Sequence, residues 1–342
     1  MLKAMIAVTC AVALHTAAAA QDARVTWAPD GTASVLNPSR NTALDGWEAY
    51  KASTTPPSVD QQLDDPVLRG AIDIHAHFGP DTYNRQWDAF EIARRAQAHG
   101  MRGIVLKSHW VDTANLAQLT REYAAPGLEV WGGLALNATV GGINPMAVRH
   151  FAEMEGHFGK VVWMPTHDSE HEVTVLHQAR PFVRVSAAGA LLPQVFEVLD
   201  LIAQYRLTLA TGHVKPEEMI AIVAAARERG IDRIIITHPG LGPQFTDPTV
   251  EQLRGVVGKG VYAEVVASEL YGALRAPTVA MIRALGPENC ILSTDSGLVG
   301  TPNHTDAMVR AARILREEGF SDGELDLMAK TNPARVLGLP VQ

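Results

Sequence analysis

The sequence predicts a single (β/α)8 TIM barrel, and three observations lead to this fold class. Eight short runs of aliphatic and β-branched residues follow one another along the chain, stretches with helical periodicity lie between them, and polar residues gather where the runs end. Such an alternation is typical of α/β proteins in which helices connect parallel strands. An open, doubly wound sheet is the alternative, because a count of strands does not show that the sheet closes.

The predicted strands are spread over most of the chain. In order, they comprise residues 70–78, 102–109, 128–137, 160–167, 207–214, 233–240, 261–268 and 291–297. The helical patterns between them include residues 87–100, 146–159, 192–205 and 216–230. The last of these begins with Pro216 and two acidic residues and ends on Gly230, which are the residue types preferred at helix starts and ends.

Composition and charge exclude several classes of protein. Hydrophobic residues make up 47% and charged residues 19% of the 342 residues, so a large core can form and overall disorder is excluded. The formal net charge is −8 and no dense cluster of Lys and Arg occurs, which argues against nucleic-acid binding. We expect a small molecule as the partner, and the sequence leaves open whether the chain forms a homo-oligomer.

The N-terminus has the features of a secretory signal peptide. A basic residue is followed by an apolar run that is short for a membrane span, and Ala18 and Ala20 fit the small-residue cleavage rule. We therefore expect a signal peptide over residues 1–20 and a mature chain that starts near Gln21, exported to the periplasm or secreted and free of the membrane. A retained membrane anchor and lipid attachment at Cys10 are the alternatives.

The rest of the chain divides into a lead-in and a barrel. Residues 21–69 are rich in Pro, Ser, Thr and Asp without a sustained period, which predicts an extended segment. Residues 70–342 are predicted to form the catalytic barrel domain. After signal cleavage Cys290 is the one remaining cysteine, so an internal disulfide is excluded.

Polar residues stand at the ends of most predicted strands, and the carboxyl ends of barrel strands form one face where active sites lie. They are His75, His77, Lys107, His109, Asn137, His167, Asp168, His213, His238, Glu264 and Asp295. One such histidine is more often a hydrogen-bonded structural residue than a ligand. Their recurrence at strand ends along the whole predicted barrel favours a functional site.

Five of these residues form a candidate metal site. His75 and His77 are two apart on a strand, so both side chains point to the same side, and imidazole nitrogens suit Zn, Mn, Fe or Ni. Asp295 follows the last strand, which closes against the first, and completes a His/His/Asp set that can accept a proton. His213 and His238 end two adjacent strands and supply the opposite wall.

This order of residues resembles the amidohydrolase superfamily of metal-dependent barrel hydrolases. In that family His-x-His ends strand one, single histidines end strands five and six, and an aspartate ends strand eight. The closing TNPARVLGL is similar to the helix that commonly ends these proteins, and the resemblance covers roughly residues 70–339. It implies a divalent metal, with zinc favoured and one or two ions per chain, and a metal-bound water that attacks the substrate. Asp295 would relay the proton, and His238 would be both ligand and catalytic residue.

The chain also departs from that pattern. The family's usual bridging ligand ends strand four, whereas Lys160 lies at the opposite end of that run. Lys107, which ends the second strand, is either carboxylated and bridges two metals, or stays an ammonium that binds a substrate carboxylate or an oxyanion. A structural salt bridge is the third alternative. The short ends of the chain favour a compact branch of the family without a β-sandwich.

Residues 166–193 form a segment too long for a minimal connection and dense in ionisable groups, which predicts a lid or specificity loop. His167, Arg180 and Arg184 in this segment, together with His109, are candidate substrate-binding residues. An arginine that faces the pocket would favour a carboxylate-bearing substrate, because the guanidinium fork matches a carboxylate.

The function that follows is hydrolysis of an amide, cyclic amide, lactone or ester bond in a small molecule. A decarboxylase-like lyase with one metal is the alternative within enzymes, and release of carbon dioxide distinguishes it. A periplasmic metal-binding or solute-binding protein without activity is the alternative outside enzymes. Asp295 argues against that last alternative, because metal storage needs no proton acceptor beside the ion.

Overall fold

The computed structural model describes residues 24–27, 33–36 and 60–341, and its centre is an eight-stranded parallel sheet. The strands are β3 (Ile72–His77), β4 (Gly103–Lys107), β5 (Glu129–Ala135), β6 (Gly159–Trp163), β9 (Thr208–Ala210), β10 (Ile234–Ile236), β11 (Val261–Val266) and β12 (Cys290–Ser293). Each strand pairs in parallel with the next along the chain. An isolated parallel bridge joins Ala76 of β3 to Ser296, just after β12, and brings the two ends of the sheet together, so the predicted barrel is confirmed.

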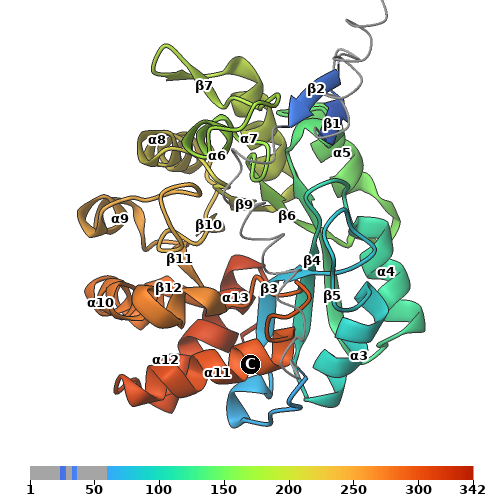
Figure 1. The fold of residues 1–342 in the computed structure, drawn as a ribbon, viewed down its shortest axis with the longest axis vertical. Helices are drawn as coiled ribbons and strands as arrows, with labels where there is room; N and C mark the ends of the chain where they lie inside the picture. The colour runs from blue at the N-terminus through green and yellow to red at the C-terminus, as the bar shows by residue number, and fades with distance from the viewer. Residues whose placement is uncertain (1–23, 28–32, 37–59, 342) are drawn as a thin grey trace, which may run out of the picture.

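Helices surround these strands in Figure 1 and cover the outer face of the sheet. They are α3 (Ala89–Ala98), α4 (Ala114–Tyr123), α5 (Pro145–Glu153), α7 (Pro193–Tyr205), α8 (Pro216–Glu228), α9 (Val250–Val256), α10 (Arg275–Leu285) and α11 (His304–Glu317). Three shorter helices are α6 (Glu170–Val175), α12 (Asp322–Asp326) and α13 (Asn332–Val336). The helix predicted over residues 146–159 is shorter than expected, because α5 ends at Glu153 and Gly156 then adopts a φ of +79°.

Two apolar clusters hold the barrel together. The larger one lies between strands and helices, and the smaller one fills the interior with Ile72, Ile74, Val105 and Trp163 among others. A shift of register between Asp73 and Ala76 interrupts the pairing of β3 with β4. The interior of the barrel is apolar toward the start of the strands. It becomes polar at their carboxyl ends, where β3 finishes on His75 and His77.

The segment before the barrel is described in part. Strands β1 (Arg24–Trp27) and β2 (Ala33–Leu36) form an antiparallel pair within the lead-in that was predicted to be extended. Residues 60–69 lie against α11, where the carboxylate of Asp306 accepts hydrogen bonds from the backbone of Gln61 and Leu63. The predicted signal peptide falls outside the described residues, so it stays a prediction. No helix among the described residues is long and apolar enough to span a membrane.

Candidate metal centre

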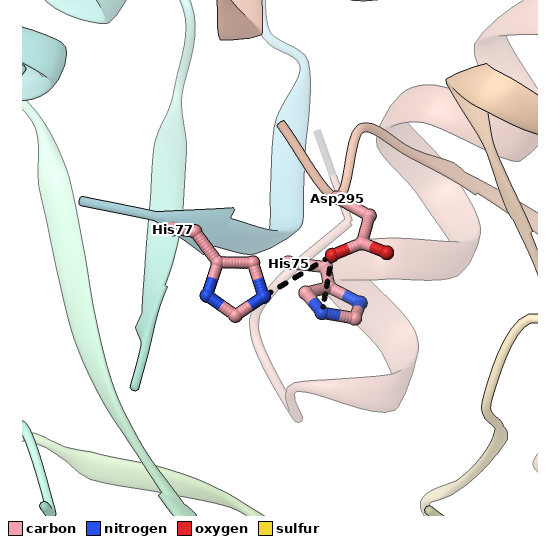
Figure 2. Close-up of side chains that lie close together, drawn as sticks. All are labelled: His75, His77 and Asp295. Carbon is pink, nitrogen blue, oxygen red and sulfur yellow. Dashed lines mark ion pairs between the residues drawn. The ribbon is translucent and has the colours of Figure 1, made fainter. Parts of the chain in front are cut away.

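Three potential metal ligands converge where the first and last strands of the barrel meet (Figure 2). Asp295 Oδ1 lies 3.0 Å from His75 Nε2 and 3.2 Å from His77 Nε2, and one ligand atom from each residue falls within 4.8 Å of the others. The backbone N–H of Asp295 donates to the carbonyl of His75, which fixes the two strand ends against each other. Both histidines are buried, while the Asp295 side chain is 21% exposed.

Two further histidines face this group from the adjacent strand ends. His213 follows β9 and His238 follows β10, and their Nε2 atoms lie 3.2 Å apart. The His238 ring stacks on that of His75 with 5.8 Å between the ring centroids. The structure thus brings all five sequence-predicted ligands to one end of the barrel.

Backbone strain marks two of these positions. Asp295 has a φ of +50° and His238 a φ of +21°, in a region that residues other than glycine rarely adopt. Such strain persists only where the surrounding structure imposes it, and it concentrates at functional sites. Both side chains are directed toward the same cluster as a result.

Buried carboxylates orient two of the rings. Glu264 Oε1, on β11, accepts from His75 Nδ1 at 2.9 Å and from Ser293 Oγ at 2.7 Å. Glu172 Oε2, on α6, accepts from His213 Nδ1 at 2.5 Å. Each carboxylate holds a ring proton on Nδ1, so Nε2 is the nitrogen that His75 and His213 direct at the cluster.

The charges of this cluster suit a bound cation. Burial by itself favours a neutral His75 ring, but the carboxylates of Asp295 and Glu264 raise its pKa to about 9. Burial would raise the pKa of the Asp295 carboxyl, yet His75 and His77 hold it well below its usual range. A proton therefore occupies the space between imidazole nitrogen and carboxylate oxygen, and a divalent cation can replace it, because these are the donors that such ions bind.

The charges and contacts of His238 and His213, at the ends of β10 and β9, also suit a bound cation. Burial, together with the nearby His213 ring, lowers the pKa of His238 to about 3, so its ring is neutral. Its Nδ1 is buried without a hydrogen-bond partner among the described residues. Nε2 atoms 3.2 Å apart need a shared proton or a cation between them, so the donor set fits a metal ion on this side as well.

Lys107 lies within the same cluster. Its side chain is almost fully buried beside Trp163, and Nζ is 2.8 Å from His75 Nε2. Burial lowers the pKa of Lys107 to about 8, against the opposing effect of Asp295, so most of the amine is protonated at pH 7. Lys107 does not belong to the lining of the cavity described next.

A cavity of about 250 Å³ opens onto the cluster. Its lining consists of His77, Tyr83, Arg85, His109, His167, Glu172, Leu176, Gln178, His213, Gln244, Phe245, Asp295 and Leu298. The volume is slightly below the range of about 300–1,000 Å³ that is typical of ligand pockets, so a small substrate is favoured. Phe245 packs edge-on against the rings of His213 and His238.

The substrate-binding candidates divide into two groups. His109 and His167 line the cavity as expected. Arg180 and Arg184, the other two candidates, do not line the cavity, so their contact with substrate stays a prediction. Arg180 donates to the carboxylate of Asp168 and the carbonyl of His167, where it neutralises a buried acid. Arg184 is 55% exposed and pairs with Glu170 on the surface.

Two functional side chains were not identified from the sequence. Glu172 bridges His213 and His167, and although burial opposes ionisation, these two rings lower its pKa to about 2. Arg85 lies in the loop after β3 and contacts His77. The only sequence signal for Arg85 is its position shortly after the His-x-His strand. No sequence signal distinguishes Glu172 from the acidic residues beside it.

Comparisons with known proteins agree with this fold. Residues 70–264 match the model of a family described as a family of unknown function (DUF6282), and no curated protein matches the chain. A probable 2-pyrone-4,6-dicarboxylic acid hydrolase from Acinetobacter baumannii is 14% identical with a TM-score of 0.53, covering 79% of this chain and 100% of that chain. N-acetyl-D-glucosamine-6-phosphate deacetylase from Mycobacterium smegmatis is 18% identical with a TM-score of 0.54, covering 80% and 77%.

An amidohydrolase from Burkholderia multivorans is 15% identical with a TM-score of 0.51, covering 79% of this chain and 99% of that chain. At these identities the similarity shows a shared fold and no shared reaction. The barrel fold that the resemblance to the amidohydrolase superfamily implied is confirmed.

Proposed function

We propose that this chain, which belongs to the family of unknown function (DUF6282), is a metal-dependent hydrolase that cleaves an amide, cyclic amide, lactone or ester bond of a small molecule. One observation carries the proposal. The ligand atoms of His75, His77 and Asp295 converge within 4.8 Å beside a cavity of substrate size. Two structural neighbours are named as a hydrolase and a deacetylase, and we carry hydrolysis over from these names as part of the proposal.

Five of the residues at the barrel mouth are assigned the role of metal ligands. His75, His77, His213, His238 and Asp295 would hold the ion, with zinc as the favoured metal. When bound, the ion would supply Lewis-acid polarisation of the scissile group and of water. His77, His213 and Asp295 also line the cavity, so these ligands face the substrate directly.

Asp295 is the proposed proton carrier. Its carboxyl has a pKa held well below the usual range by His75 and His77, so it is ionised at neutral pH and can accept a proton. The water oxygen forms a bond to the substrate carbonyl carbon while its proton moves to Asp295. The bond to the leaving nitrogen or oxygen then breaks, and Asp295 returns the proton to that atom.

The test combines metal removal with substitution of Asp295. The protein is purified without chelators, its metal content is measured, and turnover is followed with a panel of esters, lactones and cyclic amides. Chelation should abolish turnover and zinc should restore it. Asp295→Asn should lower kcat by at least about 100-fold with an unchanged thermal melt, because a general base contributes about 10²–10⁴-fold.

Asp322→Asn is the matched control, because Asp322 is a surface carboxylate that is 78% exposed and distant from the cluster in sequence. It should turn over like the wild type. Appreciable activity in Asp295→Asn would remove this residue from the mechanism. Release of carbon dioxide in place of hydrolysis products would replace the proposal by the decarboxylase-like alternative.

A further inference from the structure

Arg85 is a buried cation at the edge of the metal cluster. Its side chain is 3% exposed, and Nε donates to Asp81 Oδ2 at 2.6 Å. Asp81 is itself held by Trp110, whose Nε1 donates to Oδ1 at 2.5 Å. The guanidinium is therefore fixed in one orientation before any ligand arrives, which lowers the entropic cost of binding.

The backbone around Arg85 is fixed to the segment that carries Asp295. Arg85 forms an antiparallel bridge with Leu298, and Gln86 N–H donates to the carbonyl of Gly297 at 2.9 Å. Val299 N–H in turn donates to the carbonyl of Asn84 at 3.0 Å. These bonds join the loop after β3 to the loop after β12, so the backbone that carries Arg85 is anchored to the segment that follows Asp295.

The donors of Arg85 are only partly used. Nε binds Asp81, and Nη2 lies 3.3 Å from His77 Nδ1. Within the part of the chain that the structure describes, no hydrogen bond involves Nη1, and this nitrogen is not among the buried unsatisfied atoms. Since Arg85 lines the cavity, one arm of its fork is available to a ligand there.

The charged residues that line the cavity favour a ligand with one negative charge. Arg85 is the one arginine or lysine among the described residues that line the cavity. Glu172 and Asp295 are the two carboxylates of the lining, and each is already held by two histidines. A ligand with a single negative charge gains from Arg85, whereas a second charge on a compact group would meet one of these carboxylates.

The other residues that line the cavity are mostly apolar or aromatic, which indicates that the rest of the ligand is apolar. Leu176, Phe245 and Leu298 are apolar, and Tyr83 presents a ring over which the Arg85 guanidinium lies at 5.5 Å. An anionic end at Arg85 and an apolar end against Phe245 fit within the small volume. The cavity is thus built for an amphipathic molecule of modest size.

We propose that Arg85 binds a carboxylate of the substrate, and that the substrates are small monocarboxylates with an apolar or aromatic body next to the scissile bond. The choice of scissile bond rests on the proposed function, whereas the carboxylate-binding role of Arg85 does not. A carboxylate is favoured over a phosphate group, because a second negative charge would lie near the carboxylates of Glu172 and Asp295 that line the cavity.

Binding of benzoate and of benzamide, which have similar shape and differ in charge, tests the proposal. Calorimetry is carried out on the protein as purified and after chelation, so that a contact between benzoate and a metal cannot produce the signal. Wild-type protein should bind benzoate at least about tenfold more tightly than benzamide in both preparations. Arg85→Gln should lose about tenfold in benzoate affinity and keep its benzamide affinity.

Two further variants complete the design. Arg85→Lys keeps the positive charge but loses the planar guanidinium that Asp81 holds in place, and it should recover only part of the benzoate affinity. Arg184→Gln removes a surface arginine outside the cavity and should bind both probes like the wild type. Equal binding of benzoate and benzamide by the wild type, unchanged benzoate binding in Arg85→Gln, or tighter binding of phenyl phosphate than of benzoate would each overturn the proposal.

Turnover separates this inference from the proposed function. Arg85→Gln should raise KM for a carboxylate-bearing ester and leave KM for its neutral analogue unchanged. If benzoate binding depends on Arg85 but no metal-dependent hydrolysis is found, the proposed function fails and the carboxylate site stands. If hydrolysis requires metal but does not distinguish charged from neutral substrates, the carboxylate site fails and the proposed function stands.

Discussion

The Nζ atom of Lys107 lies 2.8 Å from Nε2 of His75, the same nitrogen that approaches Asp295 at 3.0 Å. Glu264 accepts the Nδ1 proton of His75, so a bound metal ion would take Nε2, and the Lys107 ammonium lies beside that same atom. Lys107 would thus compete with a bound cation for one ligand atom, so its charge should affect how tightly a metal binds.

Lys107→Met should leave the metal content at one ion per chain, as in the wild type, and strengthen metal binding by about tenfold or more. The reason is that the variant removes a positive charge from beside a ligand while it keeps the length of the side chain. Elemental analysis and competition with a chelator measure the two quantities. Two ions in the wild type that fall to one in the variant would show a carboxylated Lys107 that bridges two metals.

Glu172→Gln should weaken metal binding by about 10–100-fold, because a carboxylate that orients a ligand histidine contributes about this much. The neutral amide no longer holds the proton of His213 on Nδ1 as firmly as the carboxylate does. Glu170→Gln is the control on the same helix, since Glu170 pairs with Arg184 at the surface. Equal metal affinity in both variants would show that Glu172 has no part in the centre.

His304 should make the stability of the chelated protein depend on pH. It is buried, Nε2 donates to the carbonyl of His77 at 2.9 Å, and burial lowers its pKa from 6.5 to about 4. Because the folded state prefers the neutral ring, its contribution to stability is complete above pH 6.5. The contribution is lost as the pH falls from 6.5 toward 4, where the unfolded chain binds one more proton.

In that range, His304→Gln should reduce the slope of the unfolding free energy against pH by up to about 1.4 kcal/mol per pH unit. Denaturant titrations at several pH values measure this slope. His150→Gln, at an exposed position on α5, should keep the wild-type slope. Parallel curves for wild type and His304→Gln would contradict the assignment.

Gly297→Ala should destabilise the protein by about 2 kcal/mol or more and lower metal affinity. Gly297 has a φ of +136°, and an added Cβ would lie 2.5 Å from the carbonyl oxygen of His77. Thermal melts and metal titrations measure the two effects. Gly255→Ala is the control, because Gly255 lies in helix α9 with nothing within 4 Å of an added Cβ, so it should be neutral or slightly stabilising.

Much of the architecture could be predicted from the sequence, because strand and helix patterns are local. Apolar runs of strand length and helical periods between them follow from the side chains that each element buries. The position of His75, His77 and Asp295 at strand ends is likewise visible in the sequence, and a parallel barrel brings such ends to one face. The helix predicted over residues 146–159 was too long, because the turn at Gly156 depends on how the chain returns to the sheet.

The sequence by itself determined the barrel and the set of candidate ligands, whereas the tertiary structure decided which loop residues face them. Glu170 and Glu172 lie on one short helix, yet one pairs with Arg184 at the surface and the other binds His213. Arg85 faces the cavity because residues after the last strand fix its loop. Burial of a loop side chain depends on segments that are distant in the chain, and no local pattern records that packing.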